Sequence, residues 1–175
     1  MNFLRVVFLT FFIFSFSAKA GNISSTFGTS IFGVSWADNL DQVQAKYPDG
    51  KIGGAKGSRR YVVKDARDLM GLSFNKENEI TYVFNQDILT HIDISFSEKG
   101  VERFGQLKEV LVAAFGNAQV TQPTSSVVMM KWHEDEGVTL SLFKSSGVFG
   151  GALHLNIQNT ASSSEILSKR SLGFD

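Results

Sequence analysis

Polar and apolar residues alternate over several segments of the chain, and this period of two predicts β-strands with one buried and one exposed face. The pattern is clear over residues 89–96, where Ile92 and Ile94 alternate with His91 and Asp93. The predicted strands cover residues 60–64, 69–74, 80–84, 89–96, 127–132, 138–143 and 152–158. Because short polar connections join neighbouring segments, we expect antiparallel pairing.

Two other segments place apolar residues three and four positions apart, which is the spacing of an amphipathic helix. The first follows Asp38, a residue type that caps helix N-termini, and ends before Pro48. The second covers residues 101–115 and is followed by Gly116, where a left-handed C-cap is favoured. The glycine-rich residues 53–58 predict a loop.

The two faces of the predicted sheet differ in character. Over residues 152–158, Leu153 and Leu155 alternate with His154 and Asn156. An antiparallel sheet with one apolar and one polar face packs on one side only, and two amphipathic helices suit covering that side. The sequence therefore predicts a two-layer α+β domain with both helices on one face of an antiparallel sheet.

The two halves of the chain have similar apolar patterns. The aromatic residue, five polar residues and alternating strand that begin at Phe74 recur at Trp132, an offset of 58 residues. The strand that ends at Phe96 recurs at Ile157, an offset of 61 residues. An amphipathic helix precedes each group, so the pattern favours a tandem repeat of a helix followed by strands. The alternative is that any two alternating hairpins can be aligned in this way.

The first twenty residues have the pattern of a secretory signal peptide. Arg5 supplies a positive start, residues 6–17 are almost entirely apolar, and Ala18 and Ala20 frame the small-x-small sequence that signal peptidase cleaves. This apolar run is shorter than the roughly 20 residues that a membrane-spanning helix needs. We therefore expect export to the periplasm or beyond the cell, with Gly21 as the first residue of the mature chain.

The remaining chain divides into three parts. The polar residues 21–30 predict a flexible leader, and residues 31–160 contain the predicted elements of a single α+β domain. Residues 161–175 predict a C-terminal tail, which a capping-box pattern could open as a short helix. Because no second long apolar segment follows the first, we expect no membrane span in the mature chain.

Composition narrows the range of functions. Removal of residues 1–20 takes away two of the 17 basic residues and none of the 17 acidic ones, which leaves a formal charge of −2. This weak charge argues against nucleic acid as a partner. The chain contains no cysteine, which excludes disulfides, thiol catalysis and thiolate metal sites. We expect no cofactor.

The order of elements resembles that of two families. Two amphipathic helices, each followed by antiparallel strands in a chain with a signal peptide, are similar to the modules of beta-lactamase-inhibitor proteins and of small envelope proteins of the SmpA/OmlA type. The resemblance covers most of residues 36–158. Proteins of these families bind other proteins rather than catalyse reactions, so the resemblance implies a binding module. The lack of cysteine departs from both families, which use disulfides or a lipidated cysteine.

Candidate chemistry gathers on the predicted polar face. His91, Asp93 and Ser95 have the residue types of a hydrolytic triad, but positions two apart on a strand stand roughly 7 Å apart. Solvated strand positions therefore explain them better than a triad does. His91, His133 and His154 could meet on this face, with Asp93 as an oxygen ligand for zinc or copper. No two histidines have a chelating spacing, so we expect surface residues and no metal site.

Two glycine-rich loops offer further candidate contacts. The first carries Lys56, Arg59 and Arg60, which can contact an acidic partner or an anion, although the loop lacks the spacing of a phosphate-binding motif. The second, residues 144–151, places Phe149 among glycines. This aromatic side chain either anchors a partner or folds back on the core.

The sequence thus favours an exported, non-catalytic module that binds another exported or envelope protein through the polar face of its sheet. The candidate binding residues are Lys56, Arg59, Arg60, His91, Asp93, Phe149 and His154. The first alternative is a protein that binds a small ligand or a metal through its histidines. The second is a hydrolase without a recognisable motif. The oligomeric state is left open.

Overall fold

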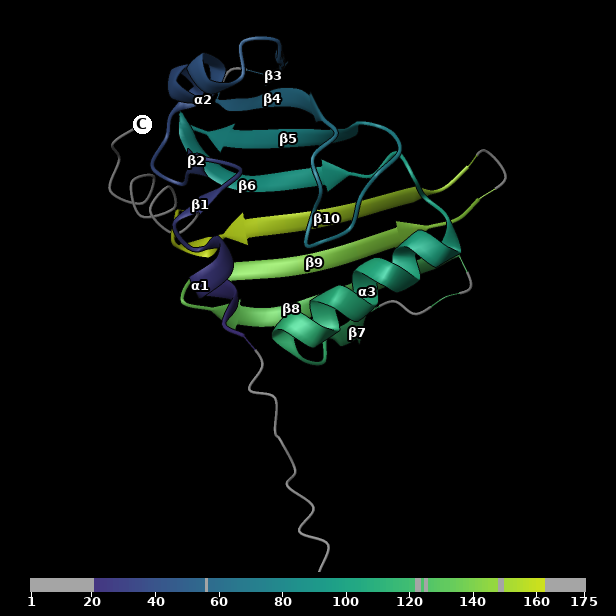
Figure 1. Cartoon of the computed structure of the whole chain (residues 1–175). Helices are drawn as coiled ribbons and strands as arrows, with labels where there is room; N and C mark the ends of the chain where they lie inside the picture. The colour runs from purple at the N-terminus through teal and green to yellow at the C-terminus, as the bar shows by residue number, and fades with distance from the viewer. Residues whose placement is uncertain (1–20, 56, 122–123, 125, 148–149, 163–175) are drawn as a thin grey trace, which may run out of the picture.

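The main feature of the fold is an antiparallel sheet of eight strands, which run in the order β3-β4-β5-β6-β10-β9-β8-β7 (Figure 1). The structure is a computed structural model that describes residues 21–55, 57–121, 124, 126–147 and 150–162. The predicted α+β class with an antiparallel sheet is confirmed. The predicted signal peptide and residues 163–175 of the predicted tail lie outside the described residues.

The elements have the following bounds. The large sheet consists of β3 (Lys51–Ala55), β4 (Ser58–Asp65), β5 (Asn78–Asn85), β6 (Ile88–Ser95), β7 (Gln119–Thr121), β8 (Val127–Asp135), β9 (Val138–Ser145) and β10 (Ala152–Asn159). A second sheet pairs β1 (Ser30–Ile31) with β2 (Val34–Ser35). The labelled helices are α1 (Ile23–Phe27), α2 (Leu40–Lys46) and α3 (Val101–Phe115), and residues 160–162 are also helical where the description ends. No helix among the described residues is both long and apolar enough to cross a membrane.

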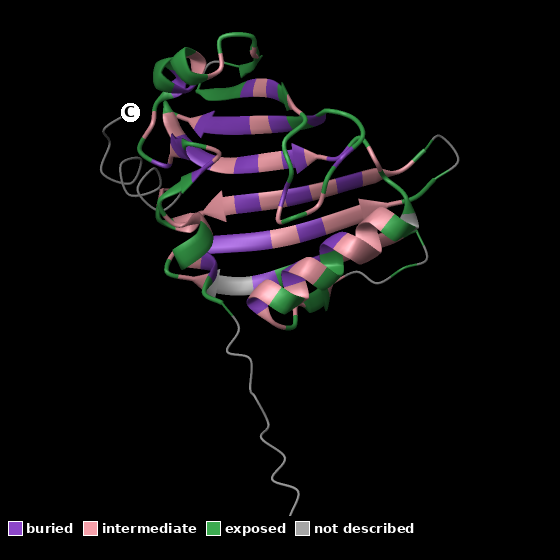
Figure 2. Cartoon of the chain, in the orientation of Figure 1, coloured by how far each residue is buried: buried purple, intermediate pink, exposed green. Residues whose placement is uncertain are grey.

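One apolar cluster forms the core. Ile94 of β6 and Leu155 of β10 are 1% and 3% exposed, and they pack in the same cluster as Leu107 and Leu111 of α3 and Val43 of α2. Figure 2 shows buried positions alternating with less buried ones along the strands. Since burying one large apolar side chain contributes about 1.5–3 kcal/mol, this cluster is the main source of stability in a chain without disulfides.

Most predicted strands are present, but the strand predicted over residues 69–74 is wrong. Leu69 and Leu72 form an isolated bridge within a turn, and Phe74 lies outside any strand. Leu69 and Phe74 are nevertheless buried, and the Phe74 ring stacks on Phe96 with centroids 5.3 Å apart. The apolar residues of this connection therefore cover the core without pairing as a strand.

The glycine-rich segment predicted as a loop belongs partly to a strand. Residues 51–55 form β3, which pairs with β4 at one edge of the sheet. All five residues of β3 are exposed, so no alternation marks the strand in the sequence. The other edge strand, β7, was missed for the same reason, because it is short and carries no buried residue.

Residues 21–30, expected to be a flexible leader, instead pack on the domain. Asn22 caps α1 by accepting hydrogen bonds from two backbone N–H groups, and Ile23 is only 5% exposed. Phe27 lies against Phe115 of α3, with ring centroids 5.8 Å apart. The Nε1 atom of Trp36 also donates to the Phe27 carbonyl oxygen at 2.6 Å. The mostly polar composition of this segment led to the wrong expectation, because its two apolar residues Ile23 and Phe27 attach it to the domain.

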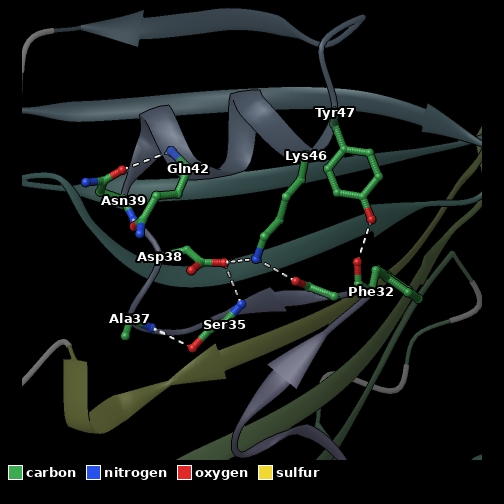
Figure 3. Close-up of polar contacts among 9 residues, drawn as sticks. Phe32, Ser35, Ala37, Asp38, Asn39, Gln42, Lys46 and Tyr47 are labelled. Carbon is green, nitrogen blue, oxygen red and sulfur yellow. Dashed lines mark hydrogen bonds and ion pairs between the residues drawn. The ribbon is translucent and has the colours of Figure 1, made fainter.

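The start of α2 is set by Asn39 rather than by Asp38 (Figure 3). The Asn39 side chain accepts from the Gln42 backbone N–H at 3.0 Å, and the Gln42 side chain accepts from the Asn39 N–H at 2.8 Å, which is a capping box. Asp38 instead accepts from the Ser35 N–H at 2.8 Å and pairs with Lys46 at 2.5 Å. Asp38 therefore ties the end of α2 to β2.

The predicted helix over residues 101–115 has the bounds of α3, which crosses in front of the sheet in Figure 1. Its N-cap is Gly100, and no side chain caps it. Gly116 follows it with φ 80° and ψ −166°, which is not the predicted left-handed cap, although this conformation also favours glycine.

Candidate functional site

The candidate site is the side of the large sheet opposite the core cluster, here called the outer face. It consists of the side chains that alternate with core residues along β4, β5, β6, β10, β9 and β8. Its central members are Thr81, Val83, His91, Asp93, Ser95, Thr139, Ser141, Phe143, His154, Asn156 and Gln158. Most of these side chains are half-buried, because neighbours on adjacent strands cover each other.

The antiparallel register brings two predicted site residues together at the junction of β6 and β10. Ser95 lies opposite His154, and Asp93 lies opposite Asn156, so Asp93 and His154 are diagonal neighbours. The Nδ1 atom of His154 lies 2.9 Å from Oδ2 of Asp93, and the two side chains are 31% and 28% exposed. Since a carboxylate only accepts hydrogen bonds, this contact assigns a proton to Nδ1.

His91 is positioned by a β-bulge between β5 and β6. The strand register shifts between Val83 and Phe84, and Thr90 is the extra residue. The buried Thr90 hydroxyl donates to the Val83 carbonyl oxygen at 3.1 Å, accepts from the Asn85 side chain at 3.2 Å and lies 3.3 Å from Nδ1 of His91. Bulges re-aim the neighbouring side chain. The sequence pattern contained no signal for this role of Thr90.

The surroundings of His91 favour its neutral form. Burial lowers the pKa of His91 below the ordinary histidine value. The charge of Asp93 opposes this effect, and the charge of Arg60 adds to it. His91 therefore contributes a neutral imidazole to the outer face at neutral pH, in line with its desolvation.

His91, Asp93 and Ser95, which have the residue types of a hydrolytic triad, do not form one. Asp93 binds His154, which comes from a different strand, rather than His91 of its own strand. Among the described residues, no serine hydroxyl hydrogen-bonds to His154. The Asp93–His154 pair thus orients an imidazole without presenting a nucleophile to it, and a hydrolytic site needs both.

His91 and His154 do not share a metal site with any other described side chain. Within the described part of the chain, no three His, Asp or Glu side chains are close enough to hold a metal ion. His154 is instead engaged by Asp93 and lies near the Phe143 ring, with centroids 6.2 Å apart. Nothing is described of the His133 side chain.

Of the candidate loop residues, Arg59 and Arg60 are described, and they lie on opposite sides of the sheet. Arg60 lies on the outer face opposite Val83, whereas its neighbour Arg59 points to the other side of β4. Arg59 lines a hollow of about 150 Å³ with Asn39, Leu40, Asp41 and Asp87. Lys56 and Phe149 lie outside the described residues.

A larger hollow lies at one end of the outer face and was not predicted. Its volume is about 380 Å³. It is lined by Lys64, Lys76, Glu77, Glu79, Ser95, Phe96, Ser97 and Lys99. These residues come from β4, β5, β6 and the connections beside them, so only the tertiary structure places them together.

Comparison with known proteins gives no family and no function for this chain. No protein-family model, no curated protein and no solved structure matches this chain. The function is therefore argued from the outer face itself.

Proposed function

We propose that this chain is an exported, non-catalytic module that binds another protein through the outer face of its sheet. The observation that carries the proposal is the broad polar surface centred on the Asp93–His154 pair, whose side chains lie outside the core cluster. The side chains of the outer face are already half-buried by their neighbours. Binding of a partner would therefore cost little additional side-chain conformational entropy.

The chemical character of the outer face supports binding to a protein. Its centre combines hydroxyl, amide and imidazole groups with the half-buried ring of Phe143. Non-obligate protein interfaces have this mixture of polar groups and occasional aromatic side chains. The contact between Asp93 and His154 orients the two side chains relative to each other, and both stay partly exposed to a partner.

The charge on one side of the outer face supports an acidic partner. Lys51 lies opposite Val62, and Arg60 and Lys64 flank Val62 on the same strand. All three basic side chains are exposed, and none forms an ion pair with another described residue. Complementary charge accelerates encounter and selects among partners. This basic group extends the contact predicted for Arg60.

The export of the chain is part of the proposal. Its support is the charged start, the short apolar run and the Ala18-x-Ala20 site of the sequence. The mass of the natural product should correspond to a chain that begins at Gly21. A soluble natural product that retains Met1 would contradict export.

We also infer that the domain is a tandem repeat with its helices on one face, as the apolar pattern of the sequence predicts. The strands β3 to β6 and β7 to β10 occupy the two halves of the sheet in mirrored order, and they meet at β6 and β10. The helices α2 and α3 precede the two sets, and both add residues to the core cluster. Phe74 and Trp132 are not equivalent, because Trp132 lies on β8 and Phe74 lies outside the strands.

Site-specific photo-crosslinking in the native envelope tests the binding surface. A photoreactive residue at Ser141 or Gln158 on the outer face should link to the same partner protein. The matched control is Glu109, an exposed residue of α3. Asn156→Arg, which places a long charged side chain at the centre of the outer face, should abolish both links while the variant stays folded.

Two results would contradict the proposal. Equal crosslinking from Glu109 would place the partner elsewhere, and an Asn156→Arg variant with unchanged crosslinks would exclude the centre of the outer face. Loss of binding in Lys51→Glu and Arg60→Glu variants, but not in Lys108→Glu on α3, would identify the partner surface as acidic. If Asn156→Arg abolishes the crosslinks but the charge reversals have no effect, the outer face remains the binding surface. The proposal of an acidic partner is then wrong.

A further inference from the structure

The first residue after the predicted cleavage site contacts the C-terminal end of α3. The backbone N–H of Gly21 donates to the carbonyl oxygen of Ala114 at 2.6 Å. Ala114 belongs to the last turn of α3, where carbonyl groups lack partners within the helix. The contact joins residues far apart in sequence and fixes the point at which the chain enters the domain.

The end of α3 is built to receive this donor. The last turn of α3 contains no basic side chain, so the helix itself supplies no cation to complement the negative end of its dipole. The neighbouring terminal carbonyl of Val112 accepts from Gly116, and the Gly116 carbonyl accepts from Trp132 Nε1 at 2.9 Å. A Cβ atom on Gly21 would lie 2.8 Å from the Ala114 oxygen, so the close approach requires glycine.

We propose that the C-terminal end of α3 is a binding site for the α-ammonium group that signal-peptide cleavage creates at Gly21. The inference rests on the export proposed above. Hydrolysis of the Ala20–Gly21 peptide bond consumes one water molecule, leaves a carboxylate on Ala20 and leaves a protonated amine on Gly21. Processing thereby replaces a neutral amide donor at Ala114 with a cationic one.

The charges on the surrounding elements favour this cation. The Ser24 N–H and hydroxyl of α1 donate to Asp135 at 3.1 Å and to Glu136 at 3.0 Å, which places the carboxylates of the last β8 residue and of the following turn next to α1. On α3, Lys108 and Glu109 are exposed and offset each other more than one turn before the helix end. The ammonium group thus meets the negative end of a helix dipole, and the nearest acidic contacts along the chain are those of Asp135 and Glu136 with Ser24.

Two forms of the mature chain test the inference. One begins at Gly21 with a free amine, and the other carries an acetyl group on the same nitrogen, which keeps the N–H donor and removes the charge. At pH 6 the free amine should lower the equilibrium constant of unfolding by about two- to five-fold, the range expected for a charge at a helix terminus. This difference in stability between the two forms should disappear at pH 10, because the amine is then neutral above the ordinary α-amino pKa of about 7.7–8.0.

Two controls separate charge from contact. A chain that begins at Ala20 moves the charge one residue away and should behave like the acetylated form. Gly21→Ala, with a free amine, should lose the advantage because its Cβ displaces the contact. Equal stability of the free and acetylated forms at pH 6, or a difference that persists at pH 10, would overturn the inference. The mass of the natural product tests the cleavage site separately, so failure of export and failure of this contact remain distinguishable.

Discussion

Neighbouring residues of β6 have opposite surroundings, and this decides what each can do. Ile94 is 1% exposed within the core cluster, whereas the Asp93 side chain is 28% exposed and is bound to His154. The period of two along a strand produces this contrast from adjacent letters of the sequence. The two residues therefore offer a direct test of the assignment of faces.

Ile94→Asp should unfold the domain, and Asp93→Asn should not. The first places an unpaired charge in the core, which costs several kcal/mol by the mechanisms known for large destabilisation. The second weakens one partly exposed contact between Asp93 and His154, which contributes about 0–1 kcal/mol. Urea unfolding followed by circular dichroism measures both. Similar losses of stability in the two variants would show that the outer face is covered.

The lowered pKa of His91 predicts a loss of stability in mild acid. Burial is the main cause of the shift. Because the folded-state pKa lies below the unfolded value of about 6.5, the unfolded chain binds a proton that the folded chain does not, and stability falls as the pH drops below that value. His91→Gln should remove part of the loss between pH 7.5 and pH 5. An unchanged acid dependence in the variant would contradict this origin.

At the scale of elements, the bulge in β6 links the sheet to the outer face. Thr90 is 1% exposed, and its hydroxyl bridges β5 and β6 next to His91. The alternating pattern of the sequence predicted the strand but not the bulge, because a bulge depends on how the partner strand pairs. The pairing of β5 with β6, rather than the sequence around His91, therefore sets the local geometry of the site.

Thr90→Val should destabilise the domain by about 1–3 kcal/mol, because the isosteric change leaves the buried Val83 carbonyl and the partly buried Asn85 amide without this partner. The His91 ring should also change position, which NMR chemical shifts of its ring protons would report. Thr81→Val, on the same outer face without such bridges, is the control and should cost less. Equal effects of the two substitutions would assign the loss to the face rather than to the bulge.

At the scale of the whole molecule, the two halves of the sheet share one core. The strands β6 and β10 pair over five residue pairs, and the core cluster includes residues from both halves. A partner that binds the outer face across this junction would contact both halves at once. The halves should therefore behave as one unit in unfolding and in binding.

Two tryptophans permit a test of this unity, since Trp36 lies in the first half and Trp132 in the second. Each is 7% exposed or less, so its fluorescence reports local packing. In the single-tryptophan variants Trp36→Phe and Trp132→Phe, the fluorescence transition in urea should coincide with the circular dichroism transition of the same variant. A fluorescence transition that precedes the dichroism transition in either variant would show that one half unfolds by itself.

The sequence by itself determined the α+β class, most central strands and the bounds of α3, because these depend on local periodicity and on chain-breaking residues such as Gly116. It also separated the two faces, because alternation fixes which residues share a side of a strand. It missed β3 and β7, which are exposed edge strands with no alternation to reveal them.

Only the tertiary structure decided which of these residues meet. The pairing of β6 with β10 brings His154 to Asp93, and the fold of residues 21–30 brings Gly21 to Ala114. Both contacts join residues that are distant in sequence, and their geometry depends on strand register and on the packing of separate elements. The local pattern fixes which face of a strand each residue occupies. It does not say which distant strands pair or where residues 21–30 dock, because these depend on the packing of the core as a whole.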